Sequence, residues 1–555
     1  MEVESRKDIG KGSVVQPMRL LLTTVINTHD PVMTTTETLC MPFDSTDTHN
    51  PPFSPLKLLA ILLPAALLPF TAIIYHFLFQ GAYFLDSGYF AYLLAKADLV
   101  MTNPPVLGPG QYMATHVSPS FWPMQYFAKM FGILPHVALG LWQALIFMGM
   151  ALAGVLFIER SQLDAKVRHS RWTFFAALLL PFSGLALSIL IYPHTEAMAM
   201  SGLFLCFALW LEDARWAQGL AWVIFVFTLG VREDVGFHVF GLLMTFLVLA
   251  WWSKQIPEGW KRLLLAALLG FVYSLAILKF QKANFTGDDA FARIYSGQPA
   301  WAHLSFEFLT HRLLEMLAHK PYLSVPAVIY MIYAARKKQI LMAVPLLAYV
   351  PWVLVNLSAV APTAGSLMSY YAYPLLALFI WPLVILRLQA GRLSGAEQRG
   401  LVLLCVGMLA VSILGFRSAM GRRLFHWMNP VHLALLFDGS YDEHKCAVEN
   451  FLKVGSGSKI MGQQFSALFP AAYSKTEVFF EPHEAVQKDY VMIWKNGYFV
   501  DKFEEEPGIR ENFEKHFSDE SVNVIWKRKN APEPGVNWGE VFAPCRESKM
   551  KMRNE

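Results

Sequence analysis

Residues 57–80 read KLLAILLPAALLPFTAIIYHFLFQ, with a single charge at Lys57, and this stretch decides the class of fold. A helix needs about 20 mostly apolar residues to cross the hydrocarbon core of a bilayer, and this run meets that length. Similar apolar blocks recur as far as residue 416. Because a spanning segment must satisfy its backbone hydrogen bonds internally, these blocks predict transmembrane helices. The sequence therefore predicts a polytopic α-helical membrane protein.

The composition supports this class and limits the partners. Hydrophobic residues make up 55% of the 555 positions and charged residues only 16%, which excludes an ordinary soluble domain. The formal net charge is only +4, and no basic motif with interleaved aromatic residues is present. Membrane lipids are therefore the expected surroundings, and nucleic acid is not an expected partner.

The predicted topology has about eleven transmembrane helices, of which the fourth, fifth and eighth are short. They lie near residues 57–80, 136–158, 172–192, 196–211, 217–232, 235–252, 262–280, 321–335, 339–360, 372–388 and 400–416. Lys and Arg are more frequent in the loops on the N-terminal side of the membrane than in the longer loops opposite. Since positive loops stay in the cytoplasm, we expect an inner-membrane protein with a cytoplasmic N-terminus and an extracytoplasmic C-terminus.

Four regions follow from this topology. Residues 1–55 are polar and rich in Thr and Pro, which predicts a disordered cytoplasmic tail. Residues 56–416 form the transmembrane domain, and its first outer loop covers residues 81–135. Residues 417–545 are predicted to form a small extracytoplasmic α/β domain, and residues 546–555 a C-terminal tail.

The α/β domain is predicted from short apolar segments that alternate with helical ones. Strands are expected at residues 458–462, 476–480, 489–494 and 522–527, and helices near residues 442–453, 463–472 and 507–517. Cys446 and Cys545 both lie in this domain, and an oxidising compartment would permit a disulfide. The sequence leaves open whether they meet.

The long first outer loop is predicted to lie against the membrane surface. Residues 88–96 have the mixed polar and apolar pattern of an interfacial helix. Tyr112, Phe121, Trp122 and Tyr126 are aromatic residues of the kind that contact lipid headgroups.

Charged and imidazole side chains gather at the predicted outer ends of the helices. Charges near lipid cost about 2.5–3.5 kcal/mol at a helix centre, so they usually face a cavity, pair or serve a function. The groups are Asp86; His116; His194 and Glu196; and Arg232, Glu233 and Asp234. Helix capping is a simpler interpretation for Asp86, Thr195 and Asp234 taken singly. Capping does not require His194 beside Glu196, so we favour one shared outer site.

A resemblance to a known family rests on six motifs in a fixed order. They are FLDSGYF (84–90), THVSP (115–119), YPHTE (192–196), GVRED (230–234), SKIMGQQFSALFP (458–470) and KDYVMIW (488–494). In this order they resemble an uncharacterised bacterial family of multi-pass membrane proteins that is similar in topology to the GT-C glycosyltransferases. The resemblance implies a GT-C-like fold and an enzyme that moves a sugar from a polyprenyl-phosphate donor to an extracytoplasmic acceptor.

The resemblance also implies roles for particular residues. In GT-C enzymes an acidic residue just after the first span commonly acts as general base, and Asp86 occupies that place. The departing lipid phosphate needs cations. The candidates are Arg232 and the juxtamembrane cluster of Arg417, Arg422, Arg423 and His426. The structural alternatives are an ion pair between Arg232 and a neighbouring carboxylate, and contact of the juxtamembrane arginines with anionic lipid.

The remaining polar groups have several possible roles. His116, His194 and Glu196 would orient Asp86, bind sugar hydroxyls or hold a divalent metal together with Asp234. The spacing of His194 and Glu196 does not place both on one face of a regular helix, and we expect no metal or other cofactor.

Three tyrosines, Tyr370, Tyr371 and Tyr373, stand near an outer span end. They fit an interfacial aromatic belt better than a surface that stacks on sugar rings.

A transporter or flippase for a lipid or glycoconjugate is the alternative function. Such proteins usually bind substrate near the bilayer midplane between internal repeats, and neither mid-span carboxylates nor a clear repeat is present in the sequence. A purely structural role is favoured if the polar clusters do not meet.

Overall fold

The computed structural model describes most of the chain after residue 52. The described ranges are 53–80, 85–103, 110–285, 291–389, 391–420, 423–454, 457–462, 477–479, 482–494, 503–518 and 523–554. The predicted tail lies outside them as far as residue 52, and so does the helix expected near residues 463–472.

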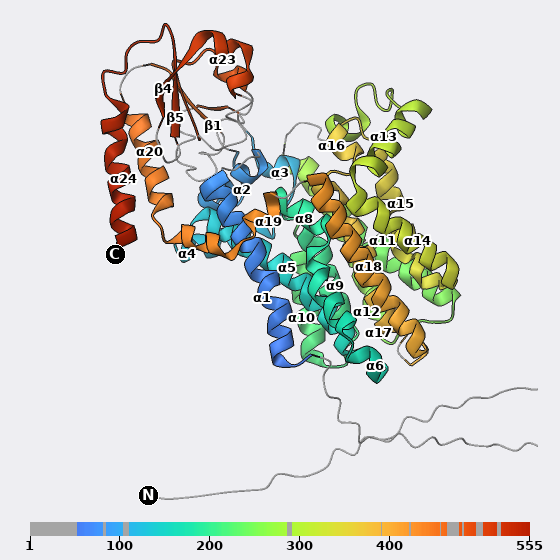
Figure 1. Cartoon of the computed structure of the whole chain (residues 1–555). Helices are drawn as coiled ribbons and strands as arrows, with labels where there is room; N and C mark the ends of the chain where they lie inside the picture. Colours follow the sequence, from blue (N-terminus) through green and yellow to red (C-terminus); the bar gives the residue numbers. More distant parts are fainter. Residues whose placement is uncertain are drawn as a thin grey trace, which may run out of the picture. The chain divides into compact units, whose positions relative to one another are not determined.

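Apolar helices make up most of the described chain (Figure 1). Within the described residues, eight helical segments are long and apolar enough to cross a membrane: Pro55–Leu78, Pro135–Glu159, Arg171–Ile191, Val235–Trp252, Trp260–Asn284, Ile340–Leu357, Pro362–Leu388 and Gly395–Ala419. Shorter helices occupy the predicted fourth, fifth and eighth spans: α9 (Ala197–Trp210), α10 (Arg215–Leu229) and α14 (Pro321–Lys337). The chain is a polytopic helical protein with a small sheet near its C-terminus. The number of spans stays a prediction.

The eight segments are built from the following helices: α1 (Pro55–Tyr75) and η1 (His76–Gln80), α5 (Pro135–Glu159), α7 (Arg171–Leu179), η3 (Leu180–Phe182) and α8 (Gly184–Ile191), α11 (Val235–Trp252), α12 (Trp260–Asn284), η5 (Ile340–Ala343) and α15 (Val344–Leu357), α16 (Pro362–Gly365), η6 (Ser369–Leu376) and α17 (Ala377–Leu388), and α18 (Gly395–Met420). Short helices in the connections are α2 (Leu85–Lys96), α3 (Tyr112–Thr115), α4 (Phe121–Met130), α6 (Ala165–Arg168), η4 (Ala292–Ser296), α13 (Phe306–His319), α19 (Arg423–Trp427) and η7 (Pro430–Leu436).

The α-helix of the third span is interrupted at its centre by a short 3₁₀-helix. Pro181 has no backbone N–H to continue the α-helical ladder, and the chain forms the short 3₁₀ segment η3 there. Ser183 then starts α8, because its side chain accepts a hydrogen bond from the backbone N–H of Ala186.

Small residues allow the helix backbones to approach closely, as membrane helix pairs require. A Cβ at Gly236 of α11 would lie only 1.9 Å from the Gly270 carbonyl oxygen of α12. A Cβ at Gly184 would lie 2.2 Å from the Ser412 carbonyl oxygen of α18. The Ser412 hydroxyl also accepts from Gly184 N at 2.9 Å and donates to the Tyr322 carbonyl at 2.6 Å. This hydroxyl therefore joins three helices at one crossing.

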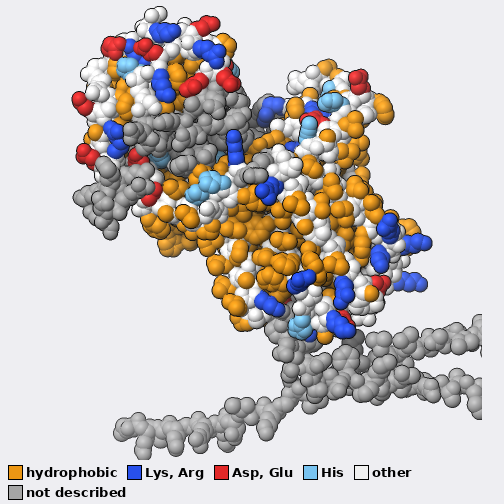
Figure 2. Space-filling view, in the orientation of Figure 1, with side chains coloured by type: hydrophobic (Ala, Val, Ile, Leu, Met, Phe, Trp, Pro, Cys, Tyr) orange, Lys and Arg blue, Asp and Glu red, His pale blue; other side chains and the backbone are white. Residues whose placement is uncertain are grey.

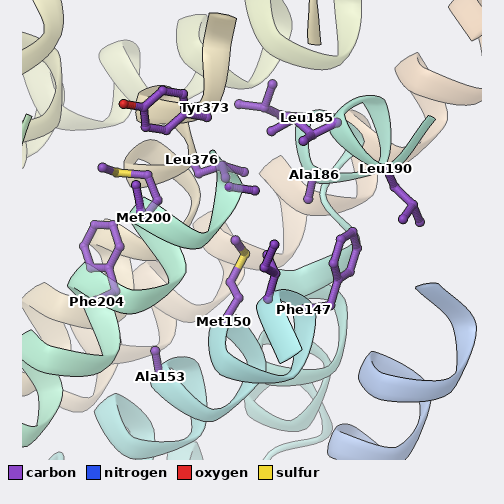
Figure 3. Packing of buried hydrophobic residues seen from close by; sticks show 14 of the residues in the cluster. Phe147, Met150, Ala153, Leu185, Ala186, Leu190, Met200, Phe204, Tyr373 and Leu376 are labelled. Carbon is purple, nitrogen blue, oxygen red and sulfur yellow. The ribbon is translucent and has the colours of Figure 1, made fainter. Parts of the chain in front are cut away.

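The centre of the helical region is apolar. Side chains from α5, α8, α9 and η6 interdigitate there, including Phe147, Met150, Leu185 and Phe204 (Figure 3). Further along α9 the rings of Phe207, Phe246 and Trp381 pack together. The polar groups of the predicted site must therefore lie at the helix ends or above this core.

The first outer loop is helical in part, but much of it is buried. Residues 88–96 belong to α2, as predicted, yet Phe90 and Leu93 are enclosed by protein. The prediction that Tyr112 and Phe121 face the headgroups is wrong, because both side chains are buried against neighbouring helices. Tyr126 of α4 does remain exposed.

The C-terminal region carries a five-stranded sheet in the order β2-β1-β3-β5-β4. The strands are β1 (Lys459–Gly462), β2 (Glu477–Phe479), β3 (Tyr490–Trp494), β4 (Phe513–Ser518) and β5 (Asn523–Arg528). Its helices are α20 (Ser440–Lys453), η9 (Pro482–Ala485), α23 (Pro507–Asn512) and α24 (Trp538–Asn554). β1 pairs in parallel with β2 and β3, whereas β5 is antiparallel to both β3 and β4.

The four predicted strands are confirmed, but the helix predicted at residues 507–517 is wrong beyond residue 512. From Phe513 the chain forms β4, whose pairing with β5 shifts register between Lys515 and Phe517. The predicted boundary at residue 545 lies inside α24. Cys446 of α20 and Cys545 of α24 form a disulfide.

Helix α20 docks on the end of the first span. The imidazole Nε2 of His444 lies 3.1 Å from the Leu78 carbonyl oxygen, and the ring of Tyr441 stacks on His136 of α5 with centroids 5.3 Å apart. The sheet domain is thus held through α20 to the same helix end that leads into α2.

The face of the helical region seen in Figure 2 is mostly hydrophobic, and Lys and Arg side chains gather at its lower end. Trp251 and Trp252 are strongly exposed near one end of this surface. Such a pattern is typical of a helix bundle that is solvated by lipid.

We predict that Gly184→Val weakens the crossing of α8 and α18. The added side chain would overlap the Ser412 carbonyl, and overpacking of this kind costs roughly 1–3 kcal/mol. The unfolding temperature of the detergent-solubilised protein should fall. Gly407→Val is the matched control, because a Cβ at Gly407 meets nothing within 4 Å. Equal stability of the two variants would contradict the assigned crossing.

We also predict that the Cys446–Cys545 bond forms in cells and stabilises the C-terminal domain. The bond closes a sequence separation of 99 residues, and loss of a native disulfide typically costs about 2–5 kcal/mol. Cys446→Ser should make the domain easier to digest with protease. Blocking free thiols before and after reduction should reveal two additional thiols only after reduction. Because Cys40, Cys206 and Cys405 lie outside this bond, the denatured, unreduced protein should show three free thiols, and five would contradict the pairing.

Candidate functional site

Three segments far apart in the chain meet in one network of charged side chains, which we call the charged network. Its members come from the loop before α4, the turn between α8 and α9, and the turn between α10 and α11. They are His116, His194, Glu196, Arg232, Glu233 and Asp234. We call the end of the helices where they lie the network side.

Glu196 is the centre of this network. His194 Nδ1 lies 3.1 Å from Glu196 Oε2, and Arg232 Nη1 donates to Glu196 Oε1 at 3.4 Å. Residues 194–196 form a turn before α9, so the two side chains meet although their spacing would separate them on a helix. Gln143 of α5 holds this turn in place, because its side-chain NH₂ donates a hydrogen bond to the His194 carbonyl at 2.9 Å.

Arg232 is buried, and its guanidinium is held by hydrogen bonds. Its Nε donates to Asp234 Oδ1 at 2.7 Å, and its Nη2 donates to Asp234 Oδ2. The guanidinium also lies over the ring of Tyr373, with 5.5 Å from Cζ to the ring centroid. Asp234 precedes α11 but makes no capping hydrogen bond, so the capping interpretation is wrong for this residue and the ion-pair interpretation is confirmed.

Glu233 points to a different partner from its neighbours. His116 Nδ1 lies 3.0 Å from Glu233 Oε1, and the backbone N–H of Val117 donates to Oε2 at 3.0 Å. Nearby, Ser120 N donates to the Gly230 carbonyl at 2.9 Å. The first loop is therefore bound to the turn between α10 and α11 by both side-chain and backbone hydrogen bonds.

The charges in this network are fixed by their mutual contacts. Burial acts to raise the pKa of Glu196, but His194, Arg232 and His116 outweigh it and lower the value to about 2. Burial likewise opposes ionisation of Asp234, and Arg232 outweighs it and lowers the pKa of Asp234. Burial and the charge of Glu196 raise the pKa of the Tyr112 hydroxyl, which lies close to the network. Both paired carboxylates stay ionised at neutral pH and are weak bases.

Aromatic rings enclose the network. Tyr370 stacks on the imidazole of His194 with centroids 3.7 Å apart and an interplanar angle of 12°. Tyr371 and Tyr373 are buried, so the interfacial-belt interpretation is wrong for these two residues. One turn into α11, His238 Nε2 lies 3.6 Å from Asp234 Oδ2, which is an ion-pair distance but too long for a hydrogen bond.

Asp86 lies in the first turn of α2, and its side chain is outside the described residues. Its neighbours fix where that turn lies. Ser87 Oγ is 3.4 Å from His76 Nε2 at the end of the first span. Phe90 contacts the His194 ring edge to face, with centroids 5.1 Å apart. The first turn of α2 therefore lies between the first span and the charged network.

The juxtamembrane helix α19 reaches the same end of the first span. The Tyr75 hydroxyl lies 3.1 Å from His426 Nε2, and the rings of His76 and Trp427 are 5.4 Å apart. Arg423 at the start of α19 is exposed. Arg422 lies outside the described residues, so its predicted role in phosphate binding is not described by the structure.

Within the described residues, no group of three or more His, Cys, Asp or Glu side chains is arranged to hold a metal ion. The carboxylates of the charged network are instead paired with Arg232 and with imidazoles.

Several residues that pack around the network were not predicted from the sequence to belong to the site: Gln143, Tyr112, Tyr373, Phe90 and His238. His238 had a signal, because it stands four residues after Asp234 on a helix, the spacing of side chains that share a face. The other four are brought in only by tertiary packing.

No protein-family model matches the chain, and no curated protein sequence matches it.

We predict that Glu196→Gln strongly destabilises the protein. Breaking a buried ion pair by removing one partner costs roughly 3–5 kcal/mol, because Arg232 and His194 lose a counter-charge. Asp213→Asn, at an exposed position just beyond the opposite end of α9, is the control. The thermal stability of the two variants in detergent provides the measurement.

The same pairing gives a direction for pH. Because the pKa of Glu196 is lowered from 4.5 to about 2, its stabilising contribution is complete above pH 4.5 and is lost as the pH falls towards 2. Wild-type stability should therefore exceed that of Glu196→Gln throughout the neutral range. A Glu196→Gln protein as stable as the wild type at pH 7 would show that the pair contributes nothing.

Proposed function

We propose that the protein is a membrane-embedded glycosyltransferase of the GT-C type. It takes a sugar from a polyprenyl-phosphate donor and transfers it to an acceptor on the extracytoplasmic side of the cell membrane. The observation that carries this proposal is the position of the first turn of α2, which is held by Ser87 and Phe90 between the first span and the charged network.

The chemistry of this transfer needs one free base. The acceptor hydroxyl forms a bond to the anomeric carbon, the bond from that carbon to the phosphate oxygen breaks, and the hydroxyl proton passes to the base. Glu196 and Asp234 are ionised but occupied by Arg232 and His194, which makes them unsuitable. Asp86 is therefore assigned as the base, in line with its place just after the first span.

The departing polyprenyl phosphate needs positive charge near the membrane surface. Arg232 has donors committed to Glu196 and Asp234 and is buried, so we assign it a positioning role. Arg423 is exposed on α19, which is attached to the first span beside the α2 turn. Arg423, with Arg422 next to it, is assigned to the phosphate.

We assign the charged network a structural role, as a rigid support next to the substrate. His116 is the most open of its members, with 28% of its side chain exposed, and it is assigned to contact with a sugar hydroxyl. Salt bridges and ring stacking hold the other members in place, so their dipoles and charges are preorganised before substrate arrives.

The position of the polar groups favours a transferase over a transporter. A transporter places its binding site near the midplane. The charged network instead lies at the ends of α10 and α11, and the side chains packed between the helices are apolar (Figure 3). The disulfide between Cys446 and Cys545 supports an extracytoplasmic C-terminal domain, because such bonds persist in oxidising compartments.

We predict that Asp86→Asn abolishes sugar transfer without unfolding the protein. Loss of a general base typically lowers the rate by about 10²–10⁴-fold. Purified protein in vesicles is supplied with labelled polyprenyl-phosphate sugars and a panel of acceptors, and release of polyprenyl phosphate is measured. Asp98→Asn is the matched control, since Asp98 lies two residues after the end of α2 and its Oδ1 accepts a hydrogen bond from Thr102 N at 2.9 Å.

Full activity in Asp86→Asn would remove the base assignment. A wild-type protein that turns over no donor, yet moves a lipid between leaflets, would replace the transferase proposal with the flippase alternative.

A further inference from the structure

Helix α13 (Phe306–His319) presents its apolar side chains outward. Phe306 is 86% exposed, and the other large apolar residues of the same face are also exposed. They are Leu309, Leu313, Leu314 and Leu317. With about 100° between successive residues of a helix, these five share one face. In a water-soluble fold such a face would turn towards the protein core.

The face that α13 turns towards the protein is centred on an arginine. Arg312 is 7% exposed, and its guanidinium donates to Glu315 Oε2 at 3.1 Å and to the Val360 carbonyl at 3.5 Å. It also lies over the ring of Phe308, with 5.1 Å from Cζ to the centroid. The helix is therefore fixed with Arg312 inward and its leucines outward. A helix on an aqueous surface would have the reverse orientation.

The helix is attached at the level where a bilayer would end. Only Lys320 separates α13 from α14, and α14 runs beside the spanning helix α18. At one end a Cβ on Gly415 would lie 2.9 Å from Tyr322 N, and at the other a Cβ on Gly400 would lie 3.0 Å from the Tyr333 hydroxyl. Gly415 stands close to the network-side end of the span Gly395–Ala419. The C-terminal end of α13 therefore lies at the boundary of the apolar layer.

The exposed apolar face does not stop at α13. Along α14 the side chains of Val325, Val328 and Ile332 are also exposed, on a helix that α18 places across the apolar layer. At the junction the side chain of Lys320 lies close to Glu315, and burial lowers the pKa of its ammonium group. The apolar stripe therefore continues from a helix that crosses the membrane onto a helix at the membrane boundary. Such a stripe fits contact with the acyl chains of one lipid leaflet.

We propose that α13 is an interfacial helix whose face of Phe306, Leu309, Leu313, Leu314 and Leu317 inserts into the lipid leaflet on the network side. Its partner is the acyl boundary of that leaflet. A second copy of this chain and a soluble protein are the other occupants that such a face would accept, and the experiment separates them.

This placement has a consequence for the charged network. The segment before α13 is hydrogen-bonded to the segment before α16, since Val360 N donates to the Tyr295 carbonyl at 3.1 Å and Ala361 N to the Ile294 carbonyl at 3.0 Å. Burial raises the pKa of the Tyr295 hydroxyl, with Arg232 lowering it and Asp234 raising it, so this residue lies within electrostatic range of the network. Helix α13 thus connects the leaflet to the edge of the network.

The test uses single cysteines labelled with an environment-sensitive nitrobenzoxadiazole fluorophore. Cys40 is replaced by Ser; Cys206 and Cys405 are buried, and Cys446 and Cys545 are bonded. Labels are placed by Leu313→Cys and Leu317→Cys on the apolar face. Glu307→Cys and His311→Cys, also exposed, are matched controls on the polar flank of the helix, about 80–160° around its axis from Leu313 and Leu317. Leu414→Cys on the exposed face of α18 is the positive control for lipid contact.

The labelled proteins are reconstituted in phosphatidylcholine and phosphatidylglycerol vesicles that carry a nitroxide on the fifth acyl carbon. We expect the Leu313 and Leu317 labels to be quenched several-fold more strongly than the Glu307 and His311 labels, and to approach the Leu414 label. Aqueous iodide should show the opposite order.

Two outcomes would overturn the proposal. Iodide quenching at Leu313 and Leu317 without nitroxide quenching would show that the face meets water or a soluble partner. Oxidative cross-linking of two Leu313→Cys chains in vesicles, with weak quenching by the lipid nitroxide, would show that a second copy covers it. The side chains at both positions are exposed, and the unfolding temperature of each labelled protein checks that it folds.

Discussion

The structure depends on one constraint: a charge that is buried in an apolar helix bundle must have a counter-charge. Arg232 and Glu196 are both nearly inaccessible, and each is surrounded by aromatic or aliphatic residues. An isolated ion in such a place would destabilise the folded protein by several kcal/mol. The turns that carry these residues therefore pack against one another. The pairing fixes the ends of α9 and α11 relative to one another. Through Glu233 and His116 it also fixes the first loop.

This constraint connects the parts of the molecule that the proposed reaction needs. The first loop carries α2, α2 contacts His194 through Phe90, and the start of α2 is bound to the first span through Ser87. The C-terminal helices α19 and α20 attach to the same end of that span. Close helix crossings at Gly184 and Gly236 supply the stiffness below, where the core is apolar. Polar groups are thereby concentrated on one side of the helices.

The sequence predicted the elements better than their surroundings. Hydropathy located the long helices because length and apolar content are local properties, and the strands β1 and β3 followed from short apolar runs. The sequence-based predictions were wrong where tertiary contacts decide whether a side chain is buried or a strand forms. Tyr112, Phe121 and Tyr373 have the composition of an interfacial belt, yet they pack inside the protein. Phe513 begins a strand only because β5 is available as a partner.

The candidate site shows the same division. Clustering of acidic and basic residues at helix ends indicated the members of the charged network, but not who pairs with whom. Asp234 was open to a capping role, and only the structure shows that Arg232 takes both of its carboxylate oxygens. Gln143 had no signal at all, since its contact is to a backbone carbonyl on another helix. The position of Asp86 between the first span and the network follows from its neighbours Ser87 and Phe90.

A double-mutant cycle between Glu196 and Arg232 tests the central claim most directly. The free energies of unfolding are measured for Glu196→Gln, for Arg232→Gln and for the protein with both changes. Because the two side chains are in contact, the account predicts a coupling free energy of about 0.5–3 kcal/mol, with the double variant less damaged than the sum of the single ones. Effects that add to within about 0.3–0.5 kcal/mol would place the two residues in separate surroundings and contradict a shared network.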